Sequence, residues 1–311
     1  MKTMDAFDIF QAPKSSCDEF ASPNIPNFIL SVTVLVGILI SYLPQHVRIV
    51  SRRSSEGLSP YFVMLGTISA SCALGNILVL PASQNAVSCC SAIGGLACAS
   101  ALLGIAQIAI QWCCFFVIML LFIIFFPKID TSEGSTLDSP FEAHPHRWQD
   151  AVITVGVAMG HFIITFIISI VIFARYPSAL QLWANLLGGL SAILAIMQYF
   201  PQIWTTWKLK AAKSLSIPMM LIQTPGAFVF ATSLALRYGL QGWSVWGVFI
   251  VTGCLQGCLL AMAIIFELQN RRDSNGPRDA SMQSERDPSE RTPLLDSPTS
   301  LENSGRAVRG H

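Results

Sequence analysis

Two Pro-Gln pairs in this chain have the residue types and the spacing of hinges in helices. Pro44-Gln45 and Pro201-Gln202 each stand near the end of an apolar run, and a tyrosine lies two positions before each proline. Proline has no backbone N–H and crowds the preceding turn, so it frees a carbonyl and lets a helix bend. The neighbouring glutamine can cap that carbonyl or line a polar path. We interpret the pairs as hinges; the alternative is that a helix ends at each proline.

The same order of residues recurs after each pair. Basic residues follow both Pro-Gln pairs, and then come Leu58-Ser59 in the first copy and Leu215-Ser216 in the second. One constant offset in residue number aligns the tyrosines, the prolines and these Leu-Ser pairs. The recurrence predicts a duplicated unit, which is how several small-solute carriers are built.

Amide side chains inside the apolar runs are candidate ligands for a polar solute. An amide is costly in hydrocarbon, so each should face the interior of a helix bundle. The candidates for the substrate path are Asn76, Gln107, Gln111, Gln198 and Gln256. The alternative is that they form hydrogen bonds between helices, worth about 0.6 to 2 kcal/mol each. Residue spacing alone does not choose between the two.

His161 lies near the middle of the apolar run 150–173 and is the candidate proton site. A neutral histidine bonded to a neighbour is the alternative, and we favour it. No Asp or Glu lies inside the apolar runs, so we expect either coupling through His161 or another group, or passive facilitation. The runs contain no Ser-His-Asp set, aspartate pair or metal-ligand cluster. We therefore expect no enzyme, no metal and no cofactor.

Composition places these residues in a lipid bilayer. Of the 311 residues, 52% are hydrophobic and only 12% are charged, against about 25% charged in a soluble domain. Charge-free stretches are long enough for spans of about 20 apolar residues each. The net charge of +1 is explained by topology and does not indicate nucleic acid.

The expected fold is an all-α membrane protein with seven transmembrane helices, in two parallel three-helix bundles joined by a linker helix (3+1+3). The predicted helices are 27–47, 60–80, 102–126, 150–173, 182–204, 217–237 and 243–267. Residues Ile93 to Ser100 are assigned to the connection before the third helix. The predicted parts are a lumenal N-terminal segment 1–26, a first bundle 27–126, a cytosolic loop 127–149, a linker helix 150–173, a second bundle 182–268 and a disordered cytosolic tail 269–311.

Lys and Arg predict the orientation. They are more numerous in the loops after the first, third and fifth helices and in the C-terminal tail, which places these in the cytosol and the N-terminus in the lumen. On the lumenal side, a disulfide from Cys17 to Cys89 or Cys90 is one alternative, and free thiols are the other. The other cysteines are expected to be free and to pack as small hydrophobes: Cys72, Cys98, Cys113, Cys114, Cys254 and Cys258.

The C-terminal tail carries an acidic dileucine pattern. Glu290 precedes Leu294-Leu295 with three residues between them. Such a segment on the cytosolic side predicts recognition by a sorting adaptor, and a chance occurrence is the alternative. It favours a vacuolar or lysosomal membrane.

The two Pro-Gln segments, their Leu-Ser followers and the seven predicted spans resemble the PQ-loop repeat family, and among its members the uncharacterised fungal ones most. The family includes cystinosin and vacuolar or lysosomal amino-acid exporters, and its fold is similar to those of the SWEET sugar facilitators and the KDEL receptor. The resemblance implies hinges at both prolines. By approximate depth it also implies solute contacts at Gln107, Gln111 and Gln256. Proton-coupled members use a membrane-embedded acid, which this chain lacks.

We therefore expect a transporter that moves a small polar solute across the vacuolar or lysosomal membrane by alternating access. An amino acid is the first candidate solute. The alternative is a seven-helix receptor or adaptor, similar to the KDEL receptor, without solute flux. The expected partners are the bilayer, the solute and a cytosolic sorting adaptor.

Overall fold

The computed structural model describes residues 17, 21, 25–55, 59–126, 148–209 and 217–275. These residues form long helices joined by short connections. The long helices are α2 (Ile25–Arg52), α3 (Pro60–Val79), α5 (Gly95–Ile124), α6 (Trp148–Arg175), α7 (Leu180–Leu209), α8 (Ile217–Tyr238) and α9 (Trp243–Asn275). The short elements are α4 (Pro81–Cys89), η2 (Pro177–Ala179) and η3 (Leu240–Gly242).

Every predicted helix coincides with an observed one, but the connection before the third helix was predicted wrongly. Residues 81–89 form α4, and α5 already begins at Gly95. Pro81 stands at the first position of α4, where a missing N–H costs nothing. Alanines and leucines then extend α5 toward its N-terminus, because they favour helix. The segment from Gly95 to Ser100 is therefore helix.

Six helices in the described part of the chain are long and apolar enough to cross a membrane, by length and composition. They correspond to α2, α3, α5, α6, α7 and α9. The chain is thus a multi-pass membrane protein. The helix α8 is not among the six, so the seven-span arrangement stays a prediction.

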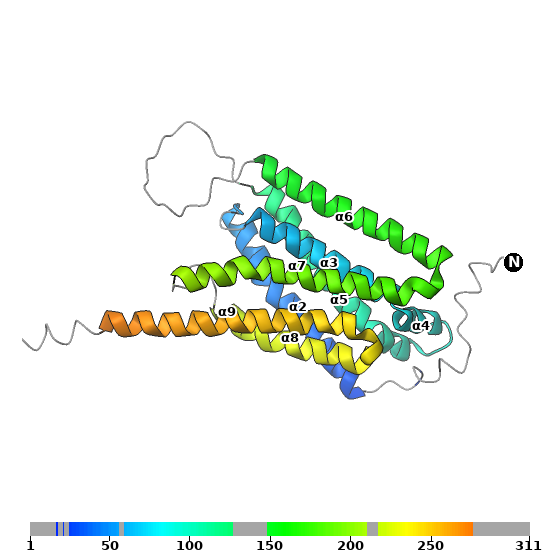
Figure 1. Cartoon of the computed structure of the whole chain (residues 1–311). Helices are drawn as coiled ribbons and strands as arrows, with labels where there is room; N and C mark the ends of the chain where they lie inside the picture. The colour runs from blue at the N-terminus through cyan, green and yellow to red at the C-terminus, as the bar shows by residue number, and fades with distance from the viewer. Residues whose placement is uncertain are drawn as a thin grey trace, which may run out of the picture. The chain divides into compact units, whose positions relative to one another are not determined.

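The first repeat packs as a bundle of α2, α3 and α5, with α5 against both of the others. Across the two repeats, α3 makes its most extensive contact with α7, and α2 packs against α8 (Figure 1). The helix α6 lies along α3. Within the second repeat α9 contacts α8, where the ring centroids of Phe230 and Phe249 lie 4.3 Å apart.

The offset that aligns the two prolines also relates these interfaces. It aligns Ser31 with Gly188 and Asn76 with Ser233. The hydroxyl oxygens of Ser31 and Ser233 lie 3.1 Å apart between α2 and α8. A Cβ added to Gly188 on α7 would lie only 2.6 Å from Nδ2 of Asn76 on α3. Aligned positions therefore meet in both interfaces, which indicates two repeats facing each other about a pseudo-twofold axis.

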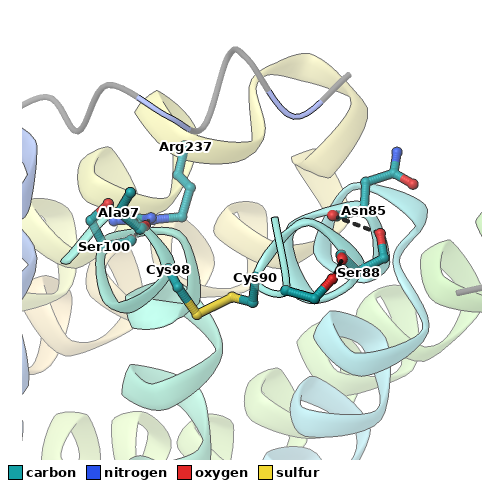
Figure 2. The surroundings of a disulfide bond; sticks show 8 residues. Asn85, Ser88, Cys90, Ala97, Cys98, Ser100 and Arg237 are labelled. Carbon is teal, nitrogen blue, oxygen red and sulfur yellow. Dashed lines mark hydrogen bonds between the residues drawn. A yellow bond between two sulfur atoms is a disulfide. The ribbon is translucent and has the colours of Figure 1, made fainter. Parts of the chain in front are cut away.

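Two disulfides gather at the end of the bundle that contains α4. Cys17 is bonded to Cys89, which selects one of the open alternatives, and Cys90 is bonded to Cys98 (Figure 2). The prediction that Cys98 is free is wrong, because α5 begins early enough to bring it beside the end of α4. We call this the disulfide end.

The chain divides into two compact units, Met1–Glu267 and Leu268–His311. All contacts discussed below belong to the first unit. The predicted sorting residues Glu290, Leu294 and Leu295 lie outside the described residues.

Candidate functional site

A cavity of about 90 Å³ lies between the two repeats. Five helices line it, namely α2, α3 and α5 from the first repeat and α7 and α9 from the second. Its lining residues are Tyr42, Gly66, Ser69, Ala70, Ala73, Ile108, Gln111, Trp112, Phe115, Ser191, Ala195, Gln198, Tyr199, Val248, Phe249, Thr252 and Gln256. Among these residues none is charged, so the site offers aromatic faces, hydroxyls and amides.

The tyrosines that precede the two Pro-Gln pairs both line this cavity. Tyr42 packs edge-on against Phe115 with ring centroids 5.4 Å apart. The hydroxyl of Tyr199 accepts a hydrogen bond of 2.7 Å from Nε2 of Gln256. The prediction of site residues omitted both tyrosines, although their matched position before each proline was the signal that could have found them.

Three of the predicted amides meet at the cavity. Gln111 comes from α5, Gln198 from α7 and Gln256 from α9. Nε2 of Gln198 donates to the carbonyl of Phe62 at 3.3 Å. Within the described residues, Oε1 of Gln111 and Oε1 of Gln256 are buried and have no hydrogen-bond partner. Buried amide oxygens normally have a partner, so these two are free to accept from a bound molecule.

The other two predicted amides lie in helix contacts outside the cavity lining. Gln107 is fully buried, and its Nε2 donates to the carbonyl of Ser31 at 2.8 Å. Asn76 is also fully buried, and its Oδ1 accepts from the hydroxyl of Ser244 at 3.4 Å. Their contacts are the interhelical bonds that the sequence offered as an alternative role.

His161 lies between α6 and α3, away from the cavity lining. Its Nε2 is 3.7 Å from the sulfur of Cys72 and 3.5 Å from the hydroxyl oxygen of Thr165. Both neighbours are neutral, so the contacts are those of a packed histidine. The structure does not bring His161 together with Gln111, Gln198 or Gln256.

Both prolines lie inside helices. Pro44 is within α2, which continues to Arg52, and Pro201 is within α7, which continues to Leu209. The alternative that each helix ends at its proline is therefore wrong. Gln45 and Gln202 follow on the same helices and lie outside the cavity lining.

One contact ties the segment after Pro44 to its own bundle. His46 donates from Nε2 to the carbonyl of Cys114 on α5 at 3.1 Å, because a carbonyl oxygen can only accept. The position aligned with His46 in the second repeat is Ile203, which cannot form such a bond. The two proline-containing helices are thus held differently beyond their prolines.

The wall between α3 and α7 is closed by a reciprocal serine pair. Each hydroxyl of Ser69 and Ser191 lies 2.9 Å from the other residue's carbonyl, and the two hydroxyl oxygens are 3.0 Å apart. Gly66 lies on the same wall, where an added Cβ would be 2.9 Å from Nε2 of Gln198. Small residues are needed here because the two helices approach closely.

Within the described part of the chain, no group of three or more His, Cys, Asp or Glu side chains could hold a metal ion.

Comparison with known proteins gives two results. Residues 26–86 and 183–243 each match the PQ loop repeat. The two matched ranges are separated by the same number of residues as the two prolines, and they begin within α2 and α7. The chain is also 32% identical over 263 residues to an uncharacterized protein of Schizosaccharomyces pombe, a match that covers 80% of this chain and 85% of the relative. With both repeats matched and a relative aligned along most of its length, the chain belongs to the PQ-loop repeat family.

Proposed function

We propose that the protein is a transporter that moves a small polar solute across its membrane by alternating access. The observation that carries this proposal is the cavity lined by both repeats, to which each repeat contributes its motif tyrosine, Tyr42 or Tyr199. A site shared by two repeats is where a carrier binds, because movement of one repeat against the other exposes it to either side. In this proposal the solute crosses unchanged.

The lining limits the chemical class of the solute. It contains no charged side chain, so a strongly charged solute would lose hydration without gaining a partner. The unpartnered side-chain oxygens of Gln111 and Gln256 can accept hydrogen bonds from donors on the solute. Tyr42 and Trp112 add aromatic surface. A neutral or zwitterionic solute rich in donors fits, and a small amino acid is our first candidate.

The cavity of about 90 Å³ is shared by the two repeats, and alternating access requires these repeats to move against each other so that it opens to one side at a time. Bending at Pro44 and Pro201 supplies that movement, since neither proline can donate the hydrogen bond that would stiffen its helix. The arrangement of three helices, one linker helix α6 and three helices suits such rocking.

Orientation and location are part of the proposal. Disulfides form in oxidising compartments, so the disulfide end belongs in the lumen or outside the cell. This agrees with the side chosen from the Lys and Arg distribution. The dileucine residues in the tail support a vacuolar or lysosomal membrane. Because His161 lies away from the cavity, passive facilitation is the simpler coupling.

The test is uptake by the purified protein in proteoliposomes, with a panel of amino acids and a pH gradient imposed and then collapsed. We expect saturable uptake of a neutral solute by the wild type. Gln256→Leu should lower uptake about tenfold, because a site that loses one hydrogen-bonding group loses about 1–3 kcal/mol. The matched control is Gln181→Leu, since Gln181 bonds to Asn185 and to the carbonyl of Gln241 outside the cavity lining.

The transporter proposal would be refuted if the wild type took up no solute faster than a Pro44→Leu, Pro201→Leu double variant. Saturable binding of a solute without flux would favour the receptor instead. Equal loss of uptake in Gln181→Leu and Gln256→Leu would contradict the claim that the solute binds in the cavity.

A further inference from the structure

Arg237 joins the two repeats at the disulfide end. It stands one residue before the end of α8, and its side chain reaches α5 and α2. Nη1 donates to the carbonyl of Ser100 on α5, and Nη2 donates to the hydroxyl of Ser31 on α2 at 3.0 Å. Figure 2 shows the guanidinium beside Ser100. One side chain of the second repeat thus holds two helices of the first.

Ser31 is the centre of this contact. It is fully buried, and its hydroxyl also meets that of Ser233 on α8 at 3.1 Å. Its carbonyl accepts from Gln107. Among the described residues, the two acceptors that Arg237 contacts are neutral oxygens of Ser31 and Ser100, so these contacts are hydrogen bonds and not ion pairs. Such a contact is easier to break and remake than a buried ion pair, whose separation leaves two uncompensated charges.

A disulfide lies near the acceptor on α5. Cys98 lies two residues before Ser100 and is bonded to Cys90 at the end of α4 (Figure 2). The start of α5 is therefore tied covalently to α4, and the Ser100 carbonyl that accepts from Arg237 lies two residues from that tie.

Arg237 also lies beside α5 between the disulfide end and the cavity. One face of α5 connects these two places through positions spaced by three and four residues: Ala97, Ala101, Gly104 and Ile108. Ile108 lines the cavity, and Ala97 and Ala101 are buried. At Gly104 an added Cβ would lie 2.7 Å from the hydroxyl oxygen of Tyr238 and 3.0 Å from Cδ of Arg237. The Arg237-Tyr238 pair therefore packs on this face of α5, beside Gly104 and between the disulfide end and Ile108.

We propose that Arg237 is the gate residue of the disulfide end. It closes the cavity to that side by fastening α8 to Ser31 and Ser100, and it must release both when the cavity opens there. The inference rests on the proposed alternating access, and it adds which residue seals which end. Arginine suits the task because its planar fork reaches two acceptors on two helices at once.

The test measures cysteine accessibility and needs no transported solute, so its result is separate from that of the uptake assay. The free cysteines of the described chain are first replaced by alanine: Cys72, Cys113, Cys114, Cys254 and Cys258. A single reporter, Ala101→Cys, is then labelled with an impermeant maleimide. The reagent is added on the side from which Leu240→Cys, at an 84% exposed position, is labelled.

We expect slow labelling of Ala101→Cys in the parent and about tenfold faster labelling after Arg237→Gln, which removes the charge-assisted hydrogen bonds. The labelling rate with Arg237→Lys should lie between these two rates, because an ammonium lacks the planar fork that reaches both acceptors at once. The matched control is Arg175→Gln, an exposed arginine at the end of α6, which should leave the rate unchanged.

A second reporter separates gate opening from unfolding. Ala158→Cys lies in the core at 1% exposure, on α6. Faster labelling of Ala101→Cys with no change at Ala158→Cys supports the gate. An unchanged rate at Ala101→Cys after Arg237→Gln, or an equal rise at both reporters, overturns it.

Discussion

Gly188→Ala tests a close approach between helices. Gly188 lies on α7 where it meets α3 and α9. A Cβ at this position would be 2.4 Å from the carbonyl oxygen of Ser244 and 2.6 Å from Nδ2 of Asn76. Real Cβ contacts are essentially never below 3.0 Å, so the helices would have to separate by about 0.6 Å, the difference between 2.4 Å and 3.0 Å. The Ser244 oxygen belongs to the backbone, so it cannot rotate away.

The energetic consequence follows from that shift. Overpacking of a tight contact costs about 1–3 kcal/mol. The separation would also lengthen the bond between Ser244 and Asn76, which is already 3.4 Å. Helix propensity works in the opposite direction, since alanine is better than glycine by about 1 kcal/mol. The steric cost and the weakened Ser244–Asn76 bond together should exceed the propensity gain, with a net loss of about 1–2 kcal/mol.

The next residue provides the control. A Cβ on Gly189 would meet nothing within 4 Å. Gly189→Ala keeps the propensity gain without the clash, so it should be neutral or slightly more stable. The measurement is the apparent melting temperature of both variants in the same detergent and at one heating rate, with the remaining folded protein monitored by size-exclusion chromatography. An unchanged melting temperature for Gly188→Ala, or an equal fall for Gly189→Ala, would refute the close contact of α7 with α3 and α9.

Three further predictions use other contacts. Cys90→Ser should lower the free energy of unfolding by about 2 kcal/mol and leave Cys98 reactive with maleimide; if no additional thiol is counted under denaturing conditions, the second disulfide is absent. Ser191→Ala should cost only about 1 kcal/mol, because the hydroxyl of Ser69 can still donate to the remaining backbone carbonyl, and a much larger fall in melting temperature would contradict this pairing. Pro201→Leu should slow transport without weakening solute binding, since the proline lies outside the cavity lining; an unchanged maximal rate would argue against its hinge role.

The helices were predictable from residue type. Long runs free of charge that do not alternate apolar and polar residues can satisfy their backbone in a bilayer only as helix. All seven predicted ranges fall on observed helices. The missed element, α4, is short and contains polar residues, so no apolar run marked it. The pairing of Cys98 failed for the same reason, because it depends on where α4 ends and α5 begins.

Side-chain roles were less predictable than helices. Gln107 and Gln111 are four residues apart and were expected to share a face, yet one bonds to Ser31 and the other lines the cavity. The direction in which a buried amide points depends on which neighbouring carbonyls are unsatisfied nearby. Those carbonyls come from other helices, and spacing along one helix does not contain them.

By itself the amino-acid sequence determined the bilayer as solvent, the duplication and the positions of the two prolines, because hydrophobicity and repetition are properties of the chain read in order. Only the tertiary structure decided that the prolines lie within continuous helices, that Tyr42 and Tyr199 share one cavity and that Arg237 reaches Ser31 and Ser100. The physical reason is that these features are contacts between segments far apart in the chain. Their geometry is set by how closely the helices pack, and that depends on small residues such as Gly66, Gly104 and Gly188 meeting particular partners.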